Sequence, residues 1–194
     1  MKKLKKNFNI IIAGVGGQGL ITLTRIIAQA ALIEGYDVKT SELHGLSQRG
    51  GSVQTHIRFG NKVYSPLVPF GKADLILGLE ITESLRNINF ANEKTIILAN
   101  KNQIFYQGAP SLEKITRELK RIFKNKAHLI PASETCQKKL GKEIVSGIYL
   151  LGVGIVKKII PLREKSILLA IKEVVPQKYF EINKKALELA KLVR

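Results

Sequence analysis

The 194-residue sequence contains a single cysteine, Cys136, and no tryptophan. One cysteine cannot form a disulfide within the chain, and it cannot supply the set of thiolates that holds an iron–sulfur cluster. We therefore expect a cytoplasmic protein that carries no cluster of its own. The three histidines, His44, His56 and His128, show no recognisable ligand spacing with acidic residues, so we predict no metal site.

Long hydrophobic segments are also missing. The longest uncharged apolar run, Ile144 to Val156, contains several glycines and is shorter than the roughly 20 residues that a membrane-spanning helix needs. The apolar stretch Phe8 to Ala13 is followed at once by glycines and does not have the pattern of a signal peptide. We expect no membrane association, and one domain with one core over residues 1–194.

Acidic residues are scarce relative to basic ones. The chain has 15 Asp and Glu against 32 Lys and Arg, for a formal net charge of +17. A nucleic-acid partner would favour a basic cluster interleaved with aromatic residues, whereas the lysines here are spread over predicted polar helix faces. We interpret the charge as a solvated basic surface, with an acidic protein partner or anionic substrates as alternatives, and we expect no nucleic-acid partner.

The most informative segment that is present runs from Asn9 to Gly19. Three consecutive isoleucines predict a strand buried on both faces, and Gly14, Gly16 and Gly19 then fit the pattern G-x-G-x-x-G before a helix predicted over residues 20–31. Glycines let the backbone tighten and approach a ligand, and the N–H groups at a helix start favour a phosphate or a carboxylate. The alternative is that these glycines only let the strand and the helix pack closely.

Strands and helices are predicted to alternate along the rest of the chain. Further strands are predicted over residues 36–41, 75–79, 95–99 and 128–131. Helices are predicted over residues 80–89, 111–123, 144–160, 162–174 and 180–193. For the second of these, Ser111 is a suitable N-cap, and the side chains predicted to point inward are Ile115, Leu119, Ile122 and Phe123. Residues 52–59 alternate between apolar and polar, and with a two-residue turn and a short strand at 62–64 they predict a β-hairpin. The expected fold class is α/β, a three-layer αβα arrangement whose mostly parallel, Rossmann-like sheet is made mixed by that hairpin.

A second loop, Glu42 to Gly51, concentrates hydrogen-bonding groups between glycines. Arg49 offers a bidentate fork for a carboxylate or phosphate, although it could instead cap neighbouring carbonyls, and His44 could be an ordinary loop histidine. Both loops leave the carboxyl ends of the first two strands, so we expect them to lie side by side. The predicted anion-binding surface comprises Gly14, Gly16, Gly17, Gln18, Gly19, His44, Ser47, Gln48, Arg49, Gly50 and Gly51. We assign no catalytic acid or base.

A stand-alone NAD(P)-binding Rossmann oxidoreductase is the alternative interpretation of these motifs. It needs an acidic residue about 20 residues beyond the glycines to bind the ribose, and Glu42 is at a suitable position. The Gly17-Gln18 pair and the long loop after Glu42 are not part of that fingerprint.

Two motifs in order, Gly14-x-Gly16-Gly17-Gln18-Gly19 and Glu42-x-His44-Gly45-x-Ser47-Gln48-Arg49-Gly50-Gly51-Ser52-Val53, resemble the gamma-type domain of 2-oxoacid:ferredoxin oxidoreductases. The resemblance continues in Tyr64-Ser65-Pro66-Leu67, Gly71-x-Ala73-Asp74, Glu80 and Glu83-x-Leu85-Arg86, and so covers at least Asn9 to Asn100. The form of the second motif is similar to that of indolepyruvate-type members.

This resemblance implies a subunit of an enzyme that oxidatively decarboxylates arylpyruvates to aryl-acetyl-CoA and passes the electrons to ferredoxin. It implies that a larger alpha subunit binds thiamine diphosphate and the iron–sulfur clusters. The present chain would then bind no cofactor alone, be inactive alone, and meet ferredoxin and CoA through the hetero-oligomer. The two glycine-containing loops would form an anion-binding surface facing the alpha subunit.

Overall fold

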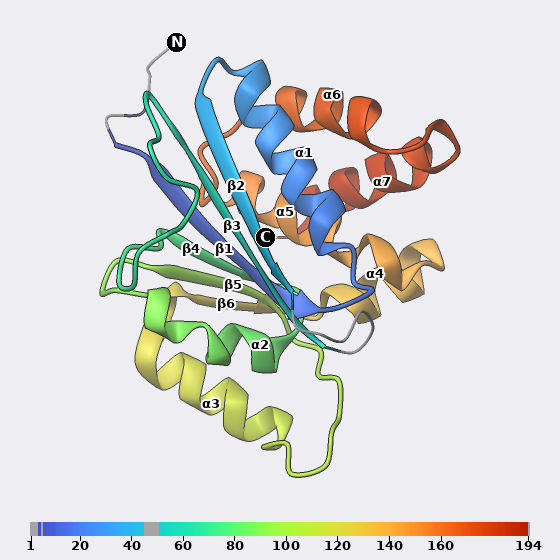
Figure 1. Cartoon of the computed structure of the whole chain (residues 1–194). Coiled ribbons are helices and arrows are strands. Elements are labelled where there is room, and N and C mark those ends of the chain that lie inside the picture. The colour runs from blue at the N-terminus through green and yellow to red at the C-terminus, as the bar shows by residue number, and fades with distance from the viewer. Residues whose placement is uncertain (1–3, 5, 45–50, 194) are drawn as a thin grey trace.

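The computed structural model describes residues 4, 6–44 and 51–193, and for His44 it describes the backbone alone. Within these residues, a six-stranded sheet has the order β2-β3-β1-β4-β5-β6 (Figure 1). The strands are β1 (Phe8–Val15), β2 (Asp37–His44), β3 (Ser52–Gly60), β4 (Leu75–Gly78), β5 (Ile96–Asn100) and β6 (Ala127–Ile130). The predicted α/β class with a mixed, mostly parallel sheet is confirmed.

The strand that makes the sheet mixed is β3, which pairs antiparallel with both β1 and β2. The parallel pairs are β1 with β4, β4 with β5, and β5 with β6. The predicted hairpin partner of β3 at residues 62–64 is wrong, because those residues form no strand. Both Ile57 and His56, which point to opposite faces, are buried, so β3 is an interior strand rather than one arm of an exposed hairpin.

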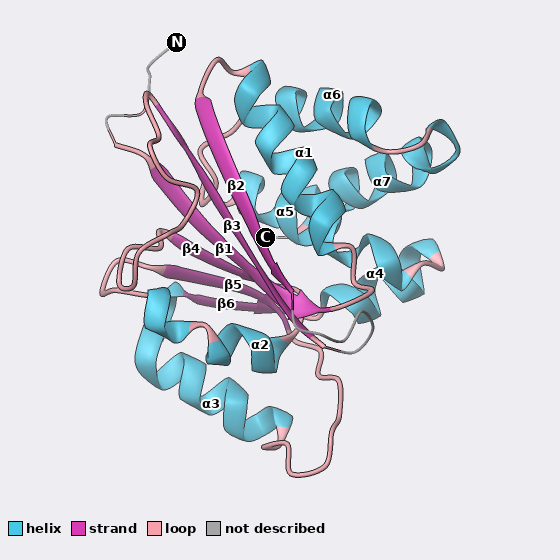
Figure 2. Ribbon diagram, viewed as in Figure 1, coloured by secondary structure: helices cyan, strands magenta, loops and turns pink. Residues whose placement is uncertain are grey.

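Helices cover both faces of the sheet (Figures 1 and 2). On one side lie α1 (Leu20–Ile33), α4 (Ala132–Leu140), α5 (Ser146–Val156), α6 (Glu164–Val174) and α7 (Gln177–Leu189), and on the other lie α2 (Ile81–Arg86) and α3 (Leu112–Phe123). Short 3-10 turns occupy Ile88–Phe90, Lys124–Lys126, Glu143–Val145 and Ala190–Leu192. Among the described residues, no helix is long and apolar enough to cross a bilayer.

The core is divided into two layers by the sheet. Ile10 and Ile12 of β1 belong to the cluster formed with α1, α5, α6 and α7, whereas Ile11 belongs to the cluster formed with α3. All three side chains are fully buried. The consecutive isoleucines therefore serve both faces of the sheet, as alternation along a strand requires.

Several predicted helices are confirmed, with local differences. Ser111 caps α3 by accepting a hydrogen bond from the Lys114 N–H, at 3.3 Å, as predicted. Ile122, predicted to point inward, is 38% exposed. The helix α4 was not predicted, because its sequence is mostly polar: its buried residues, Ala132, Ser133 and Cys136, are small and form no clear apolar stripe.

Candidate functional site

The turn between β1 and α1 uses its glycines in two ways. Gly17 and Gly19 have φ angles of 100° and 80°, which favour residues without a Cβ atom. Gly14 is different: a Cβ atom there would lie 2.8 Å from Gln18 Oε1 and 3.1 Å from Leu79 Cβ. The packing interpretation therefore holds for Gly14, whereas the turn itself requires Gly17 and Gly19.

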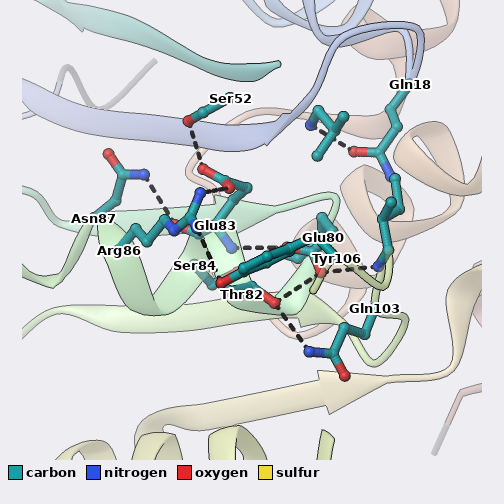
Figure 3. Close-up of polar contacts among 12 residues, drawn as sticks. Gln18, Ser52, Glu80, Thr82, Glu83, Ser84, Arg86, Asn87, Gln103 and Tyr106 are labelled. Atoms are coloured by element: carbon teal, nitrogen blue, oxygen red, sulfur yellow. Dashed lines mark hydrogen bonds and ion pairs between the residues drawn. The ribbon is translucent and has the colours of Figure 1, made fainter. Parts of the chain in front are cut away.

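Gln18 closes this turn with its own side chain. Its Oε1 accepts a hydrogen bond of 2.8 Å from the Val15 N–H (Figure 3). Its Nε2 lies 3.5 Å from the Leu79 carbonyl oxygen. The amide oxygen is thus committed to the turn, and its described contacts give Gln18 a structural role. The anion-binding role predicted for it remains a prediction.

The turn lies directly beside the end of the second predicted loop. The Gly16 N–H donates to the Gly51 carbonyl at 2.9 Å, and Val15 is paired with Ser52 across the sheet. For these described residues, the expected side-by-side placement is confirmed. Gly45 to Gly50, which include Ser47, Gln48 and Arg49, lie outside the described residues, as does the His44 side chain. Their part in anion binding stays a prediction.

Two buried carboxylates follow β4 at the same edge of the sheet. Glu80 is 1% exposed and caps α2, since its Oε2 accepts the Glu83 N–H at 2.8 Å. Its Oε1 accepts hydrogen bonds from Thr82 Oγ1 at 3.0 Å and from the Ile104 N–H at 3.1 Å. Burial raises the pKa of Glu80, while these three donors oppose the shift. Glu80 therefore fixes the start of α2 to the loop that follows β5.

Glu83 joins three segments that are distant in the sequence (Figure 3). Its Oε2 accepts a hydrogen bond of 2.5 Å from Ser52 Oγ, and its Oε1 is 2.8 Å from Arg86 Nη1. Arg86 Nη2 in turn donates to the Tyr106 hydroxyl at 3.0 Å, and its guanidinium lies 5.2 Å from the centre of the Tyr106 ring. Glu83 therefore links the start of β3 to the loop between β5 and α3.

A polar cavity of about 350 Å³ opens at the carboxyl edge of the sheet, where α/β proteins commonly bind ligands. The turn residues Gly17 and Gln18 form one wall, and Asn102, Ser133 and Glu143 contribute polar atoms. The Asn102 amide nitrogen lies 3.2 Å from Glu143 Oε1 and 3.4 Å from Ser133 Oγ.

Asn102, Ser133 and Glu143 were not predicted as site residues. Asn102 and Ser133 follow the predicted strands at 95–99 and 128–131 closely, so their place at strand ends was a usable signal. Glu143 had no such signal. The structure brings these residues together with Gly17 and Gln18, while Gly14 is packed behind the turn. In the part of the chain that the structure describes, no group of histidine, cysteine and acidic residues could hold a metal ion.

The strand order bears on the dinucleotide alternative. In the dinucleotide-binding fold the second strand lies next to the first, so that an acid at its end reaches the ribose. Here β3 lies between β1 and β2, and Glu42 is paired with Thr55 on the edge strand β2, two residues before that strand ends at His44. This arrangement does not favour Glu42 as a ribose ligand.

Comparisons with known proteins agree with one another. The family model described as pyruvate ferredoxin/flavodoxin oxidoreductase matches residues 9–192. The indolepyruvate oxidoreductase subunit IorB of Pyrococcus horikoshii is 38% identical over 95% of this chain and 94% of its own length, and that of Thermococcus kodakarensis is 36% identical over the same shares. The crystal structure of pyruvate oxidoreductase subunit PORC from Thermotoga maritima has a TM-score of 0.70 at 21% identity, covering 96% of both chains, and is similar in fold.

Proposed function

The chain belongs to the pyruvate ferredoxin/flavodoxin oxidoreductase family as a gamma-type subunit, and from that premise we propose that its enzyme oxidatively decarboxylates arylpyruvates to aryl-acetyl-CoA. The chain itself is a subunit of a ferredoxin-dependent oxidoreductase. The observation that supports an arylpyruvate substrate is the sequence identity of this chain to two subunits named for indolepyruvate, 38% and 36% over nearly the whole chain.

We infer that this subunit carries none of the redox cofactors. Thiamine diphosphate and the iron–sulfur clusters then belong to a larger alpha subunit, which also gives access to ferredoxin and CoA. The chain's residues do not fit a cluster: Cys136 is fully buried, and burial raises the pKa of its thiol to about 11, whereas cluster ligands are thiolates. The isolated chain is accordingly expected to be inactive.

The carboxyl edge of the sheet is the surface that we propose meets the alpha subunit. The β1–α1 turn and the polar cavity lie there, and Ile144, which lines the cavity, is 59% exposed. Phe105 and Tyr106, which follow the lining residue Ile104 in the chain, are 82% and 40% exposed. Exposed aromatic residues beside an arginine, here Arg86, are typical of protein interfaces. A partner seated on this edge would cover both the polar cavity and these side chains.

Co-expression with a candidate alpha subunit tests the proposal. The purified complex should reduce ferredoxin or a dye in the presence of indolepyruvate and CoA, with kcat/KM higher for indolepyruvate than for pyruvate or 2-oxoglutarate. The pure subunit, assayed at the same concentration, serves as the control and should show no activity. A complex that prefers pyruvate would overturn the arylpyruvate assignment, and activity of the subunit alone would overturn its cofactor-free role.

A further inference from the structure

We propose that a second, apolar cavity beside the polar one binds a small monoanion with an apolar body, such as an aromatic carboxylate. This cavity has a volume of about 770 Å³ and lies among the first turn of α1, the end of α4, the start of α5 and the first half of α7. Figure 1 shows these helices together on one side of the sheet. The proposal goes beyond the proposed function and does not depend on it.

The floor of the cavity is formed by apolar side chains from separate elements. Leu23, Val145, Ile148 and Val175 line it, and each is at most 7% exposed. Its volume falls in the range of about 300–1,000 Å³ that is usual for small-molecule sites. Such walls favour an apolar ligand body, because they offer water few hydrogen bonds.

The mouth of the cavity is basic. Lys142 and Lys178, both exposed, line it, and among the described residues that line the cavity there is no aspartate or glutamate. Among the described residues neither lysine forms an ion pair, and Lys178 Nζ lies 4.9 Å from the centre of the Tyr179 ring. Two lysines in the lining of an otherwise mostly apolar cavity complement a ligand with one negative group and a hydrophobic remainder.

The remaining polar groups of the cavity favour a monoanion over a nucleotide. Thr22 and Asn183 contribute neutral polar side chains, and the Asn183 amide nitrogen already donates to the Tyr179 carbonyl at 2.8 Å. A nucleotide would need donors for several phosphates and partners for a base, whereas a carboxylate needs only the groups at the mouth.

The absence of tryptophan gives a direct experiment. Indole-3-acetate is fluorescent, and its emission and anisotropy can be followed while the full-length chain is added, with no tryptophan background. We expect saturable binding at one site per chain. The neutral analogue indole-3-acetamide should bind about ten-fold or more weakly, as expected when a charge-assisted hydrogen bond is lost.

Variants locate the site. Lys142→Gln combined with Lys178→Gln should weaken indole-3-acetate binding about ten-fold or more and leave indole-3-acetamide binding unchanged. Lys185→Gln, which removes a lysine of α7 outside the cavity lining, is the matched control and should change neither affinity. Ile182→Phe, which fills part of the cavity, should weaken both ligands; circular dichroism checks that each variant is folded.

Competition with octanoate tests whether the cavity binds aliphatic carboxylates as well as aromatic ones. Displacement of indole-3-acetate identifies aliphatic acids as occupants, and failure to displace it restricts the site to aromatic acids; both results agree with the proposal. Equal affinity for the acetate and the acetamide would overturn it and leave an apolar groove for a partner's side chain. Absence of saturable binding, or an equal effect of Lys185→Gln, would also overturn it. Because no turnover is measured, these failures would leave the proposed function untouched.

Discussion

The Ser52 hydroxyl donates a hydrogen bond of 2.5 Å to Glu83 Oε2, and so joins the first residue of β3 to the middle of α2. The Glu83 side chain is 5% exposed and is also held by Arg86. This contact attaches the end of the predicted anion-binding loop to a buried carboxylate, and through Arg86 and Tyr106 to the loop after β5.

Ser52→Ala tests this contact. Removing the hydroxyl leaves one oxygen of a buried carboxylate without its donor, so the free energy of unfolding should fall by about 1.5–3 kcal/mol. Urea unfolding measures the change. Ser65→Ala is the control, because Ser65 is exposed and accepts a local hydrogen bond from the Leu67 N–H; it should cost less than about 0.5 kcal/mol. Equal losses of unfolding free energy in the two variants would mean that the Ser52–Glu83 hydrogen bond stabilises the fold no more than the exposed contact of Ser65 does.

A double-mutant cycle tests whether the network transmits between its ends. Ser52 and Tyr106 contact Glu83 and Arg86 respectively, but not each other. Ser52→Ala and Tyr106→Phe should nevertheless be non-additive in unfolding free energy, by about 0.5 kcal/mol or more, because both bias the same ion pair. The coupling should vanish when the cycle is repeated in a Glu83→Gln background. Additivity in the native background would contradict the linkage.

His56 predicts a pH dependence of stability. Its Nδ1 accepts a hydrogen bond of 3.0 Å from the Val68 N–H, so this nitrogen must be unprotonated, and burial lowers the pKa of His56 below the usual 6.5. Between pH 6.5 and the lowered pKa of His56, the unfolded state therefore binds more protons than the folded state. The stability that neutral His56 contributes is fully present above about pH 6.5 and is lost as the pH falls toward that lowered pKa.

Urea unfolding at pH 7.5 and pH 5.5 checks this expectation. The native chain should lose more unfolding free energy between the two pH values than His56→Gln, whose side chain does not titrate. Burial and Lys157 also lower the pKa of His128, and burial raises that of Glu80, but both groups remain in the variant. The difference between the two proteins therefore reports on His56 alone, and an identical pH response would refute its contribution.

Gly19 tests the backbone requirement of the β1–α1 turn. Its φ of 80° and ψ of 23° are left-handed, and among the described residues other than its chain neighbours no heavy atom lies within 4 Å of a Cβ atom placed there. Gly19→Ala should therefore destabilise the chain by about 1–2 kcal/mol through backbone strain alone. Gly19→Asn should cost less, because asparagine tolerates this conformation. Thermal unfolding compares the two variants, and equal losses would indicate a side-chain clash instead.

The loop motif predicts that Arg49 binds an anionic group. If its planar guanidinium makes paired hydrogen bonds to an anion or to a partner carboxylate, Arg49→Lys should lower the activity of the assembled complex about ten-fold or more, while the melting temperature stays unchanged. Arg25→Lys, at an exposed position of α1, is the matched control. A lower melting temperature with normal turnover would instead indicate that Arg49 caps loop carbonyls.

Local patterns were sufficient to predict much of the fold. The isoleucine run and the glycines after it identified β1, its turn and α1, because burial on both faces and a tight turn restrict which residues can be used. Ser111 and the apolar stripe after it identified α3 in the same way. The motifs Gly14 to Gly19 and Glu42 to Val53 were enough to indicate the family, since each combines unusual residues within one short segment.

Only the tertiary structure determined which strand neighbours β3 and where the carboxylates lie. The alternation of residues 52–59 is the same whether the strand pairs with residues 62–64 or inserts between β1 and β2, because side-chain period does not depend on the partner. Glu80 and Glu83 look like solvated residues of a short helix. They are buried because donors from Ser52, Thr82, Ile104 and Arg86 satisfy them, and contacts between segments distant in the chain leave no local signature.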